Sequence, residues 1–89
     1  MLPAKEPTVI FQKLADGAVL FSPSTELYFG LNEVGSRVWS LLAPVSRTLD
    51  ELCARLSAEY PTVPSEVLRV DVEELLAQLA AEGLVRPEG

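Results

Sequence analysis

The segment ELYFGLNEVGSRVW, residues 26–39, passes from a strand-like run to a helical pattern within one turn. Leucine, tyrosine and phenylalanine in residues 26–30 predict a short strand. Asn32 is a suitable helix N-cap, because its side chain can accept a backbone N–H of the first turn, and Glu33 suits the positive end of the helix dipole. Apolar residues then recur at helical spacing until Pro44. We therefore expect a strand that leads directly into a helix.

Two further strands are predicted upstream of this segment. Residues 9–14 (VIFQKL) and 18–22 (AVLFS) are rich in branched and aromatic side chains, and Gly17 between them supplies the positive φ that a tight hairpin turn needs. The three strands should form an antiparallel meander. Residues 1–7 contain two prolines and no periodicity, so we expect a loose N-terminal arm.

Two more helices are predicted downstream. Thr48 and Glu51 match a capping box, which predicts a helix that runs to about Tyr60. Residues 66–82 place leucines and valines on one face, and Gly83 is suited to a C-terminal cap. The helix over 66–82 is the longest predicted element.

The order of these elements predicts the fold class. Three strands followed by three helices indicate an α+β fold, in which a three-stranded antiparallel meander packs on the helices. Because a short turn joins the last two helices, the arrangement is winged helix-turn-helix-like. All residues, 1–89, are expected to form one domain. A chain of this length buries only about 60–65% of the surface that its unfolded form exposes, so a large enclosed active site is not expected.

The charge and cysteine content limit the classes of partner. Seven basic and thirteen acidic residues give a net charge of −6, which disfavours binding to nucleic acid. The single cysteine, Cys53, cannot form an internal disulfide, and the N-terminus has no signal-peptide pattern. No apolar run is long enough for a membrane helix. We expect a soluble cytoplasmic protein that does not bind a membrane.

Few residues suggest catalysis. The chain has no histidine, which is the commonest general base and metal ligand. Cys53 lies on the inward side of its predicted helix, so a buried hydrophobe is favoured over a reactive thiol. Glu73 and Glu74 are adjacent on a helix and project in different directions, as expected of a solvated face rather than an acid/base pair. We therefore expect no enzyme activity, metal or cofactor, and an enzyme that uses Cys53 remains an alternative.

The predicted strand over 26–30 is an unguarded sheet edge. Edge strands usually carry proline, lysine or inward charges, and the first strand has such residues near it, whereas 26–30 has only Glu26. By alternation, one side of this segment faces the helices (Leu27, Phe29 and Leu31) and the other faces away (Tyr28 and Gly30). Such an edge can accept a guest peptide as an added strand.

The helix over 66–82 supplies a second indication. Two valines lie off its leucine stripe, and the face they belong to also carries polar residues: Val67, Val70, Asp71, Glu74 and Gln78. This face is either one wall of a peptide groove or an ordinary surface with isolated valines, and spacing alone leaves both open.

The chain resembles the PqqD-like family of small domains that recognise precursor peptides of ribosomally made natural products. It is most similar to the stand-alone members of lasso peptide pathways. The residues that carry the resemblance are DGAVLF (16–21), YFGLNEVGSRVWSLL (28–42), TLDEL (48–52), Tyr60-Pro61, VDVEELLAQL (70–79) and GLV (83–85).

The resemblance implies that the leader region of a precursor peptide adds as a strand at the edge of 26–30, in the cleft beside the helix over 66–82. It assigns backbone pairing with the peptide to Leu27, Tyr28, Phe29 and Gly30, and Leu31 is also expected among the peptide-binding residues. It assigns side-chain contacts to the helix residues Val67, Val70, Asp71, Glu74 and Gln78. The implied partners are the precursor leader and a separate cysteine protease that removes it, with the cyclase of the pathway as a further candidate. Two alternatives remain open: presentation of a peptide to a radical SAM enzyme, as in the pyrroloquinoline quinone branch, and a winged-helix DNA-binding regulator.

Overall fold

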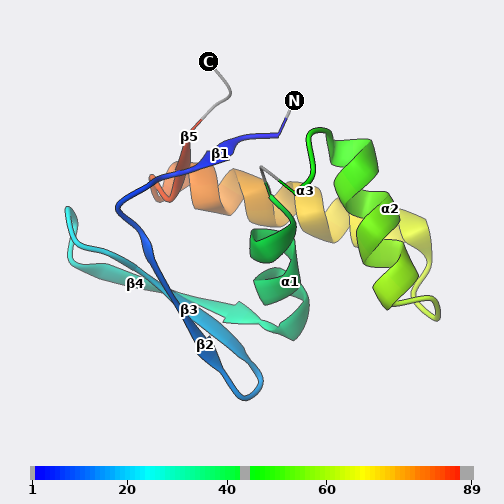
Figure 1. The fold of residues 1–89 in the computed structure, drawn as a ribbon, viewed down its shortest axis with the longest axis horizontal. Helices are drawn as coiled ribbons and strands as arrows, with labels where there is room; N and C mark the ends of the chain where they lie inside the picture. The colour runs from blue at the N-terminus through cyan, green and yellow to red at the C-terminus, as the bar shows by residue number, and fades with distance from the viewer. Residues whose placement is uncertain (1, 43–44, 87–89) are drawn as a thin grey trace.

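The computed structural model of the chain describes residues 2–42 and 45–86 (Figure 1). In chain order its elements are β1 (Ala4–Lys5), β2 (Ile10–Leu14), β3 (Gly17–Ser22), β4 (Leu27–Asn32), α1 (Glu33–Leu41), α2 (Leu49–Glu59), α3 (Ser65–Ala81) and β5 (Val85–Arg86). Three antiparallel strands in the order β2-β3-β4 precede three helices, so the predicted α+β fold is confirmed.

The passage from β4 into α1 is abrupt, as the sequence predicts. The Asn32 side chain accepts a hydrogen bond from the Gly35 N–H at 2.7 Å, which confirms the N-cap. The strand begins at Leu27 rather than at Glu26, because Glu26 has a φ of 59° and extended backbone cannot include that conformation. The predicted end of this helix at Pro44 lies outside the described residues.

The predicted caps of α2 and α3 also form. Thr48 accepts a hydrogen bond from the Glu51 N–H at 3.1 Å, although the Glu51 carboxylate bonds the backbone of the preceding Arg47 rather than that of Thr48. At the end of α3, Gly83 has a φ of 74°, and the Leu84 N–H donates to a carbonyl five residues earlier at 2.9 Å. This is a Schellman cap, and it turns the chain into β5.

The prediction of a loose N-terminal arm is wrong. β1 pairs antiparallel with β5 in a separate two-stranded sheet, and Leu2 is buried in the core. The Glu6 N–H also donates to the Leu84 carbonyl at 3.0 Å. Buried apolar surface and backbone pairing with the C-terminal segment therefore hold the arm in place.

The core lies between the helices and one face of the three-stranded sheet. α1 contacts β3, β4, α2 and α3, and so sits at the centre of the domain (Figure 1). Ala18, Leu20 and Leu31 are buried on the inner face of the sheet. The helices cover only the inner face of the sheet, so Ile10 and Tyr28 remain exposed on the outer face.

Candidate functional site

The β4 strand forms one edge of the three-stranded sheet. Within residues 2–42 and 45–86 it pairs with β3 and with no other strand. In an antiparallel ladder, successive residues alternate in the side to which their backbone N–H and C=O groups point. Every second residue of β4 therefore has both groups free to bond another strand.

The turn between β2 and β3 determines which residues these are. In a hairpin with a two-residue loop, the two residues that flank the loop are hydrogen-bonded to each other, so the backbone groups of Gly17 point to β2. The backbone groups of the next residue, Ala18, therefore point to β4. Ala18 faces Leu31 across the ladder, so Leu31 and its alternate residues bond to β3. The backbone groups of Tyr28 and Gly30 consequently point to the open edge. Those of Leu27 and Phe29, which were also expected to pair with a peptide, point to β3 instead.

The side chains of β4 alternate as predicted, with one difference at its start. Leu31 is buried, Phe29 is half-buried against the core, and Tyr28 lies on the outer face with its ring 4.7 Å from that of Phe21. Leu27 shares the inner face with Phe29 and Leu31 but is 57% exposed. It lies at the end of β4 distant from α1, so the helices do not cover it.

A cleft of about 370 Å³ lies between this edge, the first turns of α1 and the middle of α3. Its apolar surface includes Val34 and Val38 of α1 and Leu75 of α3, of which Val38 is buried. Its other lining residues are Phe29, Gly30, Leu31, Asn32, Gly35, Asp71, Val72, Glu74 and Gln78. The cleft therefore places apolar side chains directly beside unpaired strand backbone.

The structure brings most of the predicted site residues together in this cleft. Three come from β4 (Phe29, Gly30 and Leu31) and three from α3 (Asp71, Glu74 and Gln78). Tyr28 and Leu27 lie on the same strand but do not line the cleft. Val67 and Val70 are 47% and 50% exposed and lie nearer the start of α3, outside the cleft lining.

The sequence did not predict the wall that α1 contributes. Val34, Gly35 and Val38 of α1 line the cleft beside Asn32, the last residue of β4, because α1 follows β4 without a loop and its first turns stay beside the strand edge. The signal was available in the direct strand-to-helix passage and in the spacing of Val34 and Val38. Leu75, one of the leucines on the predicted apolar face of its helix, packs against the core and also lines the cleft.

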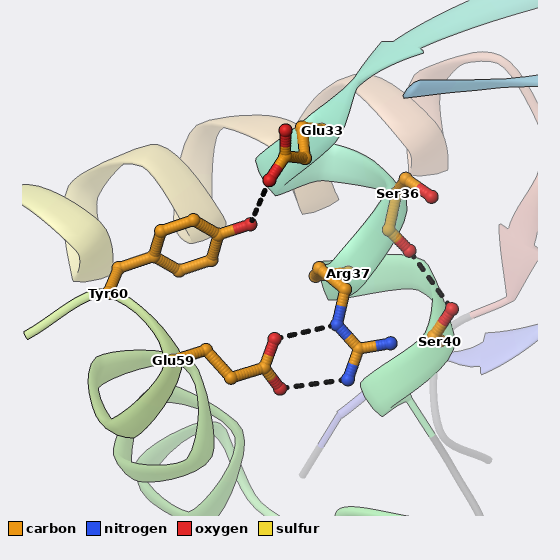
Figure 2. A network of polar contacts seen from close by, with 6 residues as sticks. All are labelled: Glu33, Ser36, Arg37, Ser40, Glu59 and Tyr60. Carbon is orange, nitrogen blue, oxygen red and sulfur yellow. Dashed lines mark hydrogen bonds and ion pairs between the residues drawn. The ribbon is translucent and has the colours of Figure 1, made fainter. Parts of the chain in front are cut away.

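A polar network holds α1 against the end of α2 (Figure 2). Arg37 donates two hydrogen bonds to the Glu59 carboxylate, at 2.7 and 2.8 Å, and this pairing lowers the pKa of Glu59. The Tyr60 hydroxyl donates to Glu33 at 3.4 Å, and burial followed by the charge of Glu33 raises the pKa of Tyr60. These contacts join α1, whose first turns line the cleft, to the end of α2. The residues that form them do not line the cleft.

Cys53 is buried on α2, as predicted, and does not line the cleft. Burial raises the pKa of its thiol, so the neutral, weakly nucleophilic form is favoured at neutral pH. Across the described part of the chain, no group of three histidine, cysteine or carboxylate side chains is placed to hold a metal ion. None of the described helices has the length and apolar character needed to cross a membrane.

The surface of α3 does not suit a DNA-reading helix. It carries Glu66, Asp71, Glu73 and Glu74, with Glu82 at its C-cap, against one cation, Arg69. The Arg69 guanidinium is itself paired with Asp50 at 2.7 Å. Such a helix would present carboxylates to a polyanion.

Comparison with known proteins agrees with this geometry. Residues 17–85 match the family model of coenzyme PQQ synthesis protein D (PqqD). No curated protein sequence matches the chain. A solved structure, TbiB1 in complex with the TbiA(beta) leader peptide, is similar with a TM-score of 0.83 and 32% sequence identity, over 97% of this chain and 98% of that one. The chain belongs to the PqqD family.

Proposed function

We propose that this chain binds the leader region of a ribosomally made precursor peptide and delivers it to the leader peptidase of a lasso peptide pathway. The observation that carries the proposal is the open β4 edge beside a cleft that is lined by both apolar and polar side chains. Support comes from the similar structure of TbiB1, which was solved with a leader peptide.

The leader would add to the sheet as a further strand. Its backbone would bond the outward N–H and C=O groups of Tyr28 and Gly30, and this part of the interaction is independent of the leader's sequence. Every second leader side chain would point to the inner face, where Phe29, Val34 and Leu75 offer apolar contacts. Recognition would thus combine a general backbone ladder with selection of inward side chains.

The chain itself would act by binding and not by catalysis. The proposed partner is a separate cysteine protease that cuts the leader while it is held, with the cyclase of the pathway as a further partner. Because both termini of an added strand leave the edge in opposite directions, the cleavage point of the precursor can remain outside the cleft. The proposed location is the cytoplasm.

Fluorescence anisotropy with the labelled leader of the precursor gene that neighbours this one tests the binding step. We expect saturable binding at micromolar concentrations or below, and faster cleavage by the cognate peptidase when the chain is present. A control leader of the same composition in scrambled order should bind weakly. No binding of the native leader, or equal binding of the scrambled one, would contradict the proposal.

The matched family model supports a second candidate, presentation of a peptide to a radical SAM enzyme in pyrroloquinoline quinone synthesis. This candidate uses the same edge and cleft, and differs in the peptide and in the partner enzyme. Competition between a lasso precursor leader and a pyrroloquinoline quinone precursor peptide for the chain distinguishes the two. The peptide that binds more tightly identifies the pathway.

A further inference from the structure

The α3 rim of the cleft is acidic. Asp71 and Glu74 are exposed there beside Gln78, while Val34, Val38 and Leu75 contribute apolar side chains to the same cleft. None of the described residues that line the cleft is a lysine or an arginine. A guest peptide in this cleft therefore meets two negative charges and no positive one.

Six of the seven lysines and arginines of the chain have side-chain contacts at other places. Four arginines pair with carboxylates outside the cleft, in the pairs Arg37–Glu59, Arg55–Glu51, Arg69–Asp50 and Arg86–Glu6. The Lys5 ammonium lies 5.4 Å from the centre of the Trp39 ring, and Lys13 donates to the Gly17 carbonyl. Within the described residues, Asp71 and Glu74 form no ion pair.

The periodicities of strand and helix match the two chemistries of the cleft. Residues 71, 74 and 78 lie three and four apart on one side of α3 and extend over about 10 Å of its axis. Inward side chains of an added strand are spaced by about 6.6 Å. One inward side chain can therefore contact Leu75 while an adjacent inward side chain, two residues away, reaches the carboxylates.

We propose that the cleft selects peptides that carry a lysine or arginine two residues from an apolar side chain, with both directed to α3. This inference rests on the proposed function and specifies the chemistry of its ligand. The carboxylates of Asp71 and Glu74 would bind the cation, and the apolar side chains that line the cleft would contact its neighbour. Peptides with an acidic residue at that position would be rejected, because like charges would meet at the rim.

Selection from a random library of displayed 15-residue peptides tests the inference with the full chain as bait. Two variants, Glu74→Lys and Glu73→Lys, serve as a matched pair, because they change the net charge equally and Glu73, although exposed on the same helix, does not line the cleft. Circular dichroism checks that both are folded. Binders are retained if Tyr28→Pro weakens them, which restricts the set to peptides that use the β4 edge.

We expect wild-type binders to share a lysine or arginine two residues from an apolar residue. Glu74→Lys should raise the Kd of these binders by about 2- to 30-fold, because one exposed ion pair is lost and a repulsion of similar size is gained. Selection on Glu74→Lys should enrich acidic residues at that position, and Glu73→Lys should leave both affinity and enrichment unchanged.

Edge-dependent binders without this basic residue, or equal effects of the two variants, would overturn the inference and leave the proposed function intact. If no binder depended on the β4 edge, the proposed function and this inference would both be wrong.

Discussion

Replacement of Tyr28 by proline separates backbone pairing at the β4 edge from every other mode of binding. The Tyr28 N–H points to the open edge, so proline removes a donor that β3 does not use. The ladder between β3 and β4 keeps its bonds, because those come from Leu27, Phe29 and Leu31. The variant should therefore fold while it loses one contact to the guest strand.

The expected loss of affinity follows from the unpaired guest carbonyl. A buried acceptor left without its donor costs about 1–3 kcal/mol, which corresponds to about a 5- to 150-fold rise in Kd. The proline ring also obstructs the approach of the neighbouring strand, so the larger values are expected. Isothermal titration calorimetry with the native leader measures the change.

Two control variants make the result specific. Tyr28→Ala removes the ring that packs on Phe21 but keeps the N–H, so it should bind the leader with little change. Lys13→Pro makes the same backbone change on β2, the opposite edge of the sheet, and should also retain affinity. Unchanged affinity of a folded Tyr28→Pro variant, or equal losses in Tyr28→Pro and Tyr28→Ala, would refute the argument from backbone pairing.

Three further predictions concern the stability and reactivity of the chain. Arg37→Gln should lower the free energy of unfolding by about 0.5–1 kcal/mol at pH 7. Arg37 lowers the pKa of Glu59, so this stabilisation is fully present above the unfolded-state pKa of about 4.3 and is lost as the pH falls through the lower folded-state pKa. The free energies of unfolding of wild type and variant, measured by urea titration, should therefore become equal near pH 3. Gly17→Ala should lower the free energy of unfolding by about 1–3 kcal/mol, measured by thermal unfolding, because the added Cβ would collide with the β4 backbone. Gly30→Ala should change it little, because a Cβ at that position has no neighbouring atom within 4 Å. Iodoacetamide should alkylate Cys53 slowly in the native protein and rapidly in urea, and fast native alkylation would contradict its burial.

The sequence predicted the elements that have caps and periodicity. Asn32, Thr48 and Gly83 each occupy the cap position expected of them, because local hydrogen bonding determines these ends. β1 and β5 could not be predicted, since strands of two residues are too short to show alternation and form only when distant segments meet. Local pattern therefore determined most of the fold, and contact between the termini determined the rest.

Only part of the candidate site could be predicted, because its limits also depend on contacts between distant segments. Alternation shows which side of a strand a residue occupies but not how far a helix extends over it, so the exposure of Leu27 could not be foreseen. Helical spacing likewise placed Val67 and Asp71 on one face without showing where along α3 the cleft ends. Those limits are set by the packing of α1 between the sheet and α3.

The claim that the leader adds as a strand at β4 is tested most directly by amide hydrogen exchange, read residue by residue by NMR with and without saturating leader. The amides of Tyr28 and Gly30 should exchange rapidly in the free chain and become protected in the complex. Those of Phe29 and Leu31, already bonded to β3, should change little. The claim would be contradicted if the leader protected the Lys13 amide on the opposite edge instead. It would also be contradicted if the Tyr28 and Gly30 amides stayed unprotected with the leader bound.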